Sequence, residues 1–584
     1  MKLAGKPYER HLLAVILVYG LGFAVYWNSF SVPFVFDDYP NIRDNPSIRL
    51  TSLDLDALRA AAFEGYAQRR PLANLSFALN YAAGGYDVKG YHLVNVLIHV
   101  ANGVLVYFVA LILFRRSRSI TNREDLTDRR LRLAALLAAA IFVAHPVQVQ
   151  AVTYIVQRMS SMATMFCLAS LLLYLLGRER EARFRRWTLW CGASIAWLLG
   201  LGSKEIAAAL PAAILLTELI FYRELDRAPE KRRPVSVAAC TLLASIAILA
   251  AGFVYLGADP AGAIAEQYES RDFGVVERLL TELRVLVFYL SLLIFPWPAR
   301  LNIDHGFEVS HSLVDPVSTL ACAVLLVLSV ALAVRLARRQ PIVSFSILWY
   351  FVTLAIESSF IGLELVFEHR LYLPMLGFAL VVAYGFQLLP ARYGSAATAL
   401  ACVLVIALAA GSAVRNDVWR DPVLLWADAA AKNPRGYRAR NNLGRSLAER
   451  GEIEAAERAF EDAIRVEPDF AEPYNNLGAL YAQAGRIDTA IENFEKAIVL
   501  NSRYAQAYNN LGVALLDAGQ VHESASVLAR AIRIAPGYAK AHANLAASLA
   551  RLGQPDEACR HLRLALELDP GVDHSIEALD RCRR

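Results

Sequence analysis

Two adjacent carboxylates, Asp37 and Asp38, are the residues of this chain whose surroundings best suit chemistry. They follow the first long apolar run, in the sequence Val-Pro-Phe-Val-Phe-Asp-Asp-Tyr. An ionised carboxylate is costly at a membrane boundary, which argues for a function. One of the pair could act as a general base toward a hydroxyl group or help to hold a divalent metal ion. The structural alternative is an ordinary turn, since Pro40, Asn41 and Asn45 follow.

Polar and basic residues near the ends of other apolar runs are a second group of candidates. His92, Asn95, His99 and Asn102 recur every three or four residues and therefore share one helix face. For His99 and Asn102 this spacing favours a hydrogen-bonded seam between helices, whereas His92 could reach a site at the end of the run. The remaining candidates are His145, Arg158, Lys204, Glu205, His369 and Arg370. Their cations could bind a lipid-linked phosphate, although single Arg and Lys residues more often serve as snorkelling anchors.

Long apolar runs must position these residues, and we expect the runs to be membrane spans. The chain of 584 residues is 56% hydrophobic and 19% charged, whereas soluble proteins average about 45–50% apolar and about 25% charged residues. A span needs about 20 apolar residues. The candidates are 11–30, 91–114, 131–147, 150–176, 188–202, 205–222, 235–256, 277–297, 316–334, 341–358, 371–389 and 396–414.

Basic loops between the runs predict the orientation, because they stay on the cytoplasmic side. Lys2, Lys6 and Arg10 precede the first run, and Arg-rich loops follow the second, fourth and sixth. The later basic loop at 335–339 lies on the cytoplasmic side only if 277–297 is a re-entrant or interfacial helix. About 11 crossings then remain, and an odd number places the C-terminal part opposite the N-terminus. The net charge of +5 is modest and indicates no nucleic-acid partner.

The C-terminal part repeats with a period of 34 residues, which is typical of tetratricopeptide repeats (TPRs). The recurring positions are Leu443, Leu477, Leu511 and Leu545, and Gly451, Gly485, Gly519 and Gly553. We predict a membrane domain over 1–414 and a TPR domain over 415–584, with a cap helix at about 421–432 before four repeats. Stacked repeats form a concave groove, in which Asn442, Asn476, Asn510 and Asn544 could bind a peptide backbone. The alternative is that these Asn residues are ordinary TPR usage. Cys559 and Cys582 could form a disulfide, although no pattern predicts one.

The segments together resemble a known family, the protein O-mannosyltransferase-like proteins that join a GT-C membrane domain to C-terminal TPRs. The resemblance is carried by Asp37-Asp38, Arg70-Pro71-Leu72, Tyr91-His92-Leu93-Val94-Asn95, His145-Pro146-Val147, Lys204-Glu205 and His369-Arg370-Leu371-Tyr372-Leu373-Pro374. It implies an all-α, polytopic GT-C fold followed by a TPR α-solenoid. It also implies that the Asp pair carries the catalytic carboxylate. The residues that would bind the phosphate or the sugar of the donor are Arg70, His92, His145, Arg158, Lys204, Glu205, His369 and Arg370. One departure is Gln148-Val149-Gln150, where the family often reads His-Thr-Glu, which puts a metal or acid role there in doubt.

The function that the resemblance implies is a membrane glycosyltransferase. It would move a sugar, mannose or another hexose, from a polyprenyl-phosphate donor to a Ser or Thr hydroxyl of a protein held by the TPRs. We expect a bacterial inner-membrane protein with periplasmic TPRs, because its loops are compact. Two alternatives remain: a TPR scaffold whose membrane domain is inactive, and a ligase of lipid-linked glycans. The sequence leaves dependence on a divalent metal at Asp37 and Asp38 open.

Overall fold

In the part of the chain that the structure describes, the regular elements are all helices. The computed structural model describes residues 7–65, 67–123, 125–222, 257, 259–269, 271–569 and 571–572, and no strand occurs among them. The chain divides into two compact units, one up to Asp421 and one from Pro422. The predicted all-α class is confirmed. The predicted boundary at 414/415 falls inside a helix that continues to Trp419.

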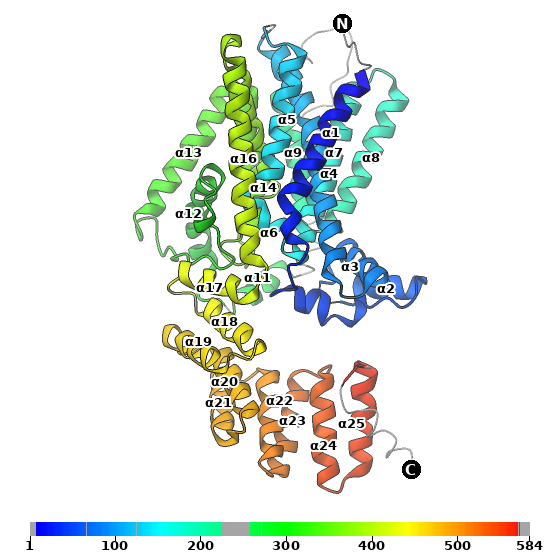
Figure 1. The fold of residues 1–584 in the computed structure, drawn as a ribbon, viewed down its shortest axis with the longest axis vertical. Coiled ribbons are helices and arrows are strands. Elements are labelled where there is room, and N and C mark those ends of the chain that lie inside the picture. Colours follow the sequence, from blue (N-terminus) through cyan, green and yellow to red (C-terminus); the bar gives the residue numbers. More distant parts are fainter. Residues whose placement is uncertain are drawn as a thin grey trace. The chain divides into compact units, whose positions relative to one another are not determined.

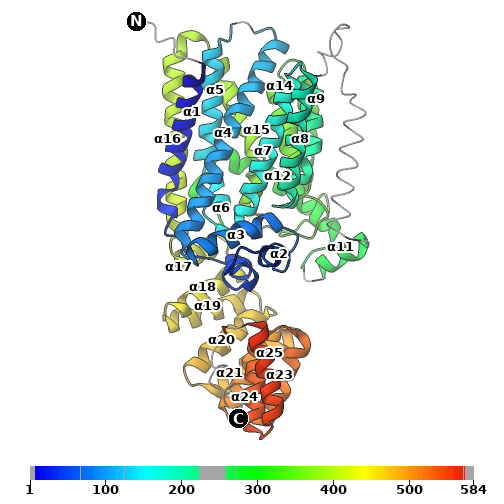
Figure 2. The ribbon, with the colours of Figure 1, turned by 90° about the vertical axis from the view of Figure 1, so that its right-hand side faces the viewer.

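The first unit is a bundle of long helices with short ones at one end (Figures 1 and 2). Its helices are α1 (Pro7–Tyr26), α2 (Leu55–Phe63), α3 (Pro71–Gly84), α4 (Val88–Ile120), α5 (Asp128–Ala144), α6 (Val149–Val152), α7 (Arg158–Arg178), α8 (Arg183–Leu201), α9 (Leu210–Phe221), α11 (Pro260–Tyr268), α12 (Val275–Ile294), α13 (Ser318–Leu336), α14 (Pro341–Leu354), α15 (Met375–Leu388) and α16 (Gly394–Trp419). Three short 3-10 helices matter for the site: η4 (Pro146–Gln148), η6 (Glu205–Ala209) and η9 (Glu368–Leu371).

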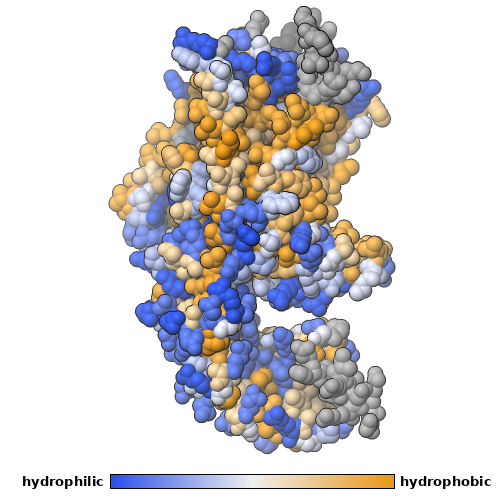
Figure 3. All heavy atoms as spheres, viewed as in Figure 1, coloured by the Kyte–Doolittle hydropathy of each residue, from blue (hydrophilic) through white to orange (hydrophobic). Residues whose placement is uncertain are grey.

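Several of these helices are long and apolar enough to cross a membrane. Among the described residues five qualify, at His11–Ser29, Val88–Ile120, Ile155–Arg178, Ser318–Leu336 and Gly394–Trp419. A sixth would be the pair α5 and 146–152, bent by 49°. On the face that Figure 3 shows, hydrophobic residues gather over the middle of this bundle, as expected of a surface that faces lipid. The predicted span 235–256 lies outside the described residues, and the count of 11 to 12 spans stays a prediction.

Most candidate residues lie at one end of this bundle, which we call the site end. Here α1 ends, and α4 and α7 begin. His92 near the start of α4 contacts the carbonyl of Val32 at 2.8 Å, and Asn28 donates to the carbonyl of Ala413 near the end of α16 at 2.9 Å. The loop from 30 to 54 and the helices α2 and α3 close this end (Figure 1).

Helix α12 and the loop after it form a hairpin at the site end. Glu277 in the first turn of α12 lies 2.7 Å from Nδ1 of His311, shortly before α13 begins. Ser310 donates its N–H to the hydroxyl of Thr281 at 2.8 Å, so the returning chain runs alongside α12. Helices α12 and α13 therefore begin at the same end. This is the arrangement that a re-entrant helix requires, and we retain the prediction that 277–297 does not cross.

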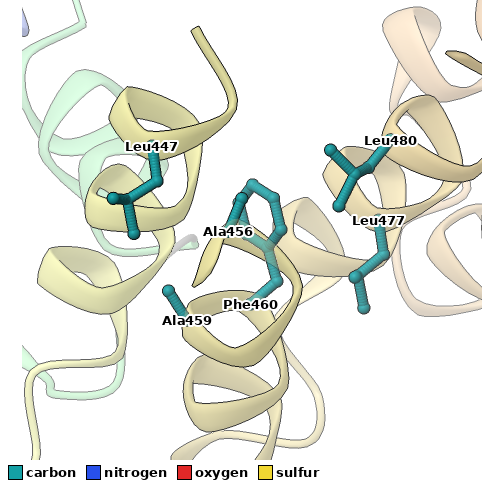
Figure 4. Packing of buried hydrophobic residues seen from close by; sticks show 6 residues of the cluster. All are labelled: Leu447, Ala456, Ala459, Phe460, Leu477 and Leu480. Atoms are coloured by element: carbon teal, nitrogen blue, oxygen red, sulfur yellow. The ribbon is translucent and has the colours of Figure 1, made fainter. Parts of the chain in front are cut away.

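The second unit consists of paired antiparallel helices. They are α17 (Pro422–Lys432), α18 (Tyr437–Glu449), α19 (Ile453–Val466), α20 (Ala471–Gln483), α21 (Ile487–Leu500), α22 (Ala505–Asp517), α23 (Val521–Ile534), α24 (Ala539–Arg551) and α25 (Pro555–Leu568). Buried Leu447, Phe460 and Leu477 pack between neighbouring helices (Figure 4). The glycine at each turn is required because the backbone has a positive φ there, for example +83° at Gly451.

Candidate functional site

The structure gives the two adjacent carboxylates different environments. Asp38 is fully buried, and its two oxygens accept hydrogen bonds from the N–H groups of Val35 at 2.9 Å and Val156 at 2.7 Å. It therefore joins the loop after α1 to the turn before α7. Asp37 is only partly buried. Of the two carboxylates, Asp37 is therefore the one that is partly exposed to solvent.

The backbone around Asp37 is held in an unusual conformation. Phe36, just before it, has a positive φ of 47°, which is rare for a side chain with a Cβ and is often found at functional sites. The hydroxyl of Tyr154 accepts a hydrogen bond from the N–H of Asp37 at 2.7 Å, and it also interacts with the carboxylate. Burial raises the pKa of Asp37, while Tyr154 and Arg70 oppose that rise. A carboxylate with a raised pKa is a stronger base once ionised.

Two ion pairs involve the candidate residues Arg70, Glu205 and Lys204. Arg70 binds Glu205 through two contacts, at 2.9 and 3.2 Å, and its side chain is 29% exposed. Lys204 is buried and contacts Glu357 at 2.8 Å. The charge of Arg70 is close enough to Asp37 to lower the pKa of that carboxyl group. Each cation has a carboxylate partner, so a donor phosphate would have to compete with it.

His369 and Arg370 lie in η9, next to the ion pair of Lys204 and Glu357. Arg370 is buried, donates to the carbonyl of Leu365 at 2.9 Å and lies 4.0 Å from Glu357. Burial, together with Lys204, Arg370 and Arg70, holds the pKa of His369 well below its ordinary value. Because Arg70 influences the pKa of both Asp37 and His369, the structure brings these two residues into one charged site.

Arg158, which the sequence suggested as a phosphate ligand, is fully buried at the start of α7. Its guanidinium donates to Asn95 at 2.7 Å, to Asn80 at 2.6 Å and to the carbonyl of Tyr91 at 2.9 Å. It also lies 4.8 Å from the ring centre of Phe77. With its donors bound by the protein, Arg158 serves to connect α3, α4 and α7 behind the Asp pair.

The two other histidine candidates also have structural contacts. His92 is buried and holds the loop after α1 through Val32. His145 is buried between α5 and η4, where its Nε2 lies 3.0 Å from the carbonyl of Leu293. In the deeper seam, His99 contacts the hydroxyl of Tyr372 at 2.6 Å and Asn102 donates to Ser161 at 2.9 Å. These contacts agree with the predicted interhelical seam.

Sequence reasoning missed three residues of the site. Tyr154 and Glu357 lie in apolar runs and have no local pattern that distinguishes them. Gln150 was noted only as a departure from the family, yet its Oε1 contacts His369. Nearby, His305 and buried Glu368 approach to 2.9 Å. Only spatial contacts between distant segments reveal these residues.

The residues present at Asp37 and Asp38 do not assemble a metal site. Both oxygens of Asp38 accept backbone N–H groups, so this carboxylate is already held by the protein. Within the described part of the chain, no group of three or more His, Cys, Asp or Glu side chains could hold a metal ion.

The asparagines of the TPR unit form a ladder between repeats. Asn476 donates to Asn441 at 2.8 Å, and the equivalent contacts are Asn510 to Asn475 at 3.0 Å and Asn544 to Asn509 at 2.8 Å. Asn442, in the first repeat, is buried. Each amide nitrogen carries two hydrogens. The half-exposed Asn476, Asn510 and Asn544 therefore each have one amide hydrogen that the ladder does not use.

Comparison with known proteins identifies the repeats and supports the resemblance. Residues 444–485 and 480–519 match a family model described as TPR repeat, and 505–535 and 539–572 match two models described as tetratricopeptide repeat. The crystal structure of MamA covers 25% of this chain and 86% of its own, with 24% identity and a TM-score of 0.23.

Curated relatives match most of the chain. The Drosophila melanogaster protein named protein O-mannosyl-transferase Tmtc3 is 25% identical over 520 residues, which cover 79% of this chain and 56% of that protein. The Caenorhabditis elegans protein O-mannosyl-transferase F38B6.6 is 23% identical and covers 79% of this chain and 63% of its own length. The predicted resemblance is confirmed. The chain spans little more than half the length of these relatives.

Proposed function

We propose that this chain is a membrane glycosyltransferase that moves a sugar, preferably mannose, from a polyprenyl-phosphate donor to a Ser or Thr hydroxyl of a protein. The observation that carries the proposal is the difference between the two carboxylates: Asp38 is buried and anchors the loop, whereas Asp37 is partly exposed and lies near Arg70. The names of the relatives support the choice of mannose and of a protein acceptor.

In the proposed reaction, Asp37 removes the proton from the acceptor hydroxyl. The hydroxyl oxygen forms a bond to C1 of the sugar as the bond from C1 to the phosphate oxygen breaks, so the configuration at C1 inverts. The leaving group is a lipid phosphate, which departs as an anion and needs no proton. Arg70, Lys204 and Arg370 would stabilise that charge. Arg70 is the most accessible of the three, and the buried Arg158 has no part in this proposal.

We further propose that the TPR unit binds the acceptor protein and lies on the outer face, the periplasm of a bacterial cell. The free amide hydrogens of Asn476, Asn510 and Asn544 could bind backbone carbonyls of an extended chain without reading its sequence. Cys559 is disulfide-bonded, and disulfides persist in oxidising compartments. The hairpin of α12 supports the odd number of crossings that this orientation needs.

The test is transfer by the purified chain in liposomes. Wild type should move mannose from polyprenyl-phosphate-mannose to a Ser/Thr-containing peptide, and Asp37→Asn should be slower by about 10²- to 10⁴-fold, because a positioned base contributes that much. Asp56→Asn, at an exposed carboxylate of α2, is the matched control and should be as fast as wild type. Absence of transfer by wild type with every polyprenyl-phosphate sugar would favour the inactive scaffold.

A further inference from the structure

The contact between Gln150 in α6 and His369 in η9 assigns the position of a proton. Oε1 of Gln150 lies 2.8 Å from the backbone N–H of His369 and 3.2 Å from Nδ1 of its ring. A backbone N–H can only donate, so the atom that faces it must be the amide oxygen and not the amide nitrogen. An amide oxygen can only accept, so Nδ1 must carry a proton for the second contact to be a hydrogen bond.

The other ring nitrogen of His369 is then a bare acceptor. In a neutral imidazole one nitrogen donates and the other accepts. Nε2 of His369 has no hydrogen-bond partner among the residues that the structure describes, and it is not one of the enclosed polar atoms. The residue as a whole is 6% exposed. Nε2 is therefore the ring nitrogen that the protein does not fully enclose.

The surroundings keep this imidazole neutral. Lys204, Arg370 and Arg70 surround the ring, and with burial they hold the pKa of His369 well below its ordinary value. The carboxylates that face these cations include Glu357, Glu205 and Glu282, and each is engaged in an ion pair. The ring of Phe367 stacks on the imidazole at 5.1 Å. The neutral form is thus maintained through the physiological pH range.

We propose that Gln150 is a positioning residue that holds His369 in the Nδ1–H tautomer, so that Nε2 accepts a hydrogen bond from a substrate hydroxyl. The inference rests on the proposed glycosyl transfer. An acceptor nitrogen selects between the groups of a substrate. A sugar or Ser/Thr hydroxyl can donate a hydrogen bond to it, whereas an ionised phosphate diester cannot. Nε2 would therefore bind the hydroxyl-bearing part of a substrate, and the phosphate would lie against the cations.

The kinetic test uses Gln150→Glu, which keeps the size of the side chain. A carboxylate still accepts both N–H groups but stabilises the imidazolium, whose Nε2 carries a proton and cannot accept. We expect KM to rise about 2- to 10-fold with little change in kcat, as for the loss of one neutral hydrogen bond. The rise should grow as the pH falls and disappear at high pH. The KM of the wild type should not show this dependence on pH between about pH 6 and 8.

The substrate whose KM rises identifies the hydroxyl: the polyprenyl-phosphate-mannose or the acceptor peptide. Gln340→Glu is the matched control, because that glutamine accepts from the hydroxyl of Tyr384 at 2.8 Å and not from His369. It should keep the wild-type KM. Equal KM values for Gln150→Glu and wild type across this pH range would overturn the inference.

A second measurement does not depend on activity. In ¹⁵N-histidine NMR spectra of the full chain, the signal lost in His369→Gln should have the neutral Nδ1–H pattern in wild type and the imidazolium pattern in Gln150→Glu at pH 6. An Nε2–H pattern in wild type would overturn the inference even if the enzyme is active. Failure of wild type to transfer any sugar would instead reject the proposed function, and the NMR result would still decide the tautomer.

Discussion

At the scale of single residues, the Asp pair shows how identical neighbours acquire different roles. The carboxylate of Asp38 accepts from the backbone of two segments, whereas that of Asp37 contacts Tyr154 and is partly exposed. Burial raises the pKa of both. For Asp38 the hydrogen bonds from Val35 and Val156 oppose that rise, which makes it a structural carboxylate.

Replacement of Asp38 by Asn should therefore destabilise the protein. An amide has one acceptor oxygen, so one of the N–H groups of Val35 and Val156 would face an NH₂ group. A buried donor without a partner costs about 1–3 kcal/mol. Thermal unfolding in detergent should show this loss for Asp38→Asn and not for Asp37→Asn. A stable Asp38→Asn with an unstable Asp37→Asn would reverse the assignment of the two roles.

The pH dependence of transfer should report the charges around Asp37. Because burial raises the pKa of Asp37 above 3.8, and the base works only when ionised, kcat/KM should fall as pH decreases through that raised pKa. Arg70 lowers the pKa of Asp37 and Glu364 raises it. Arg70→Gln should therefore move the acid limb to higher pH, and Glu364→Gln should move it to lower pH. Shifts in the same direction would contradict the location of the base.

At the scale of helices, the sequence predicted the repeats far better than the site. The 34-residue period determined which residues pack between TPR helices because each repeat packs against its neighbours in the same way. In the membrane unit, apolar runs marked helices, but they could not distinguish Arg158, bound by Asn80 and Asn95, from Arg70, which remains partly exposed. Those partners come from distant segments and have no local signature.

The close approach of paired TPR helices depends on glycine. A Cβ added at Gly444 would lie 2.6 Å from the ring of Phe460, and one at Gly512 would lie 2.5 Å from Leu528. Gly444→Ala and Gly512→Ala should each destabilise the TPR unit by about 1–3 kcal/mol, because a filled core resists added volume. Gly537→Ala, which has open space around it, is the control. Limited proteolysis of the full chain measures the difference, and equal resistance of all three would contradict this packing.

At the scale of the whole molecule, orientation determines which proteins can be acceptors. With a re-entrant α12, the C-terminal unit is expected opposite the N-terminus. Protease added to intact spheroplasts should then remove the TPR unit, and Cys559 should resist thiol reagents until a reductant is added. Protection in spheroplasts with cleavage in inverted vesicles would place the TPRs in the cytoplasm. A Cys559 that reacts without reductant would remove the disulfide argument.

The most direct test of the central claim is mass spectrometry of outer-face proteins from cells that carry wild type, Asp37→Asn or Asp56→Asn at equal membrane levels. The proposal predicts hexose on Ser or Thr residues with wild type and Asp56→Asn, and its loss with Asp37→Asn. Equal hexose modification with Asp37→Asn and wild type would contradict a catalytic role for Asp37, and no hexose-modified protein in any strain would contradict the proposed transfer itself.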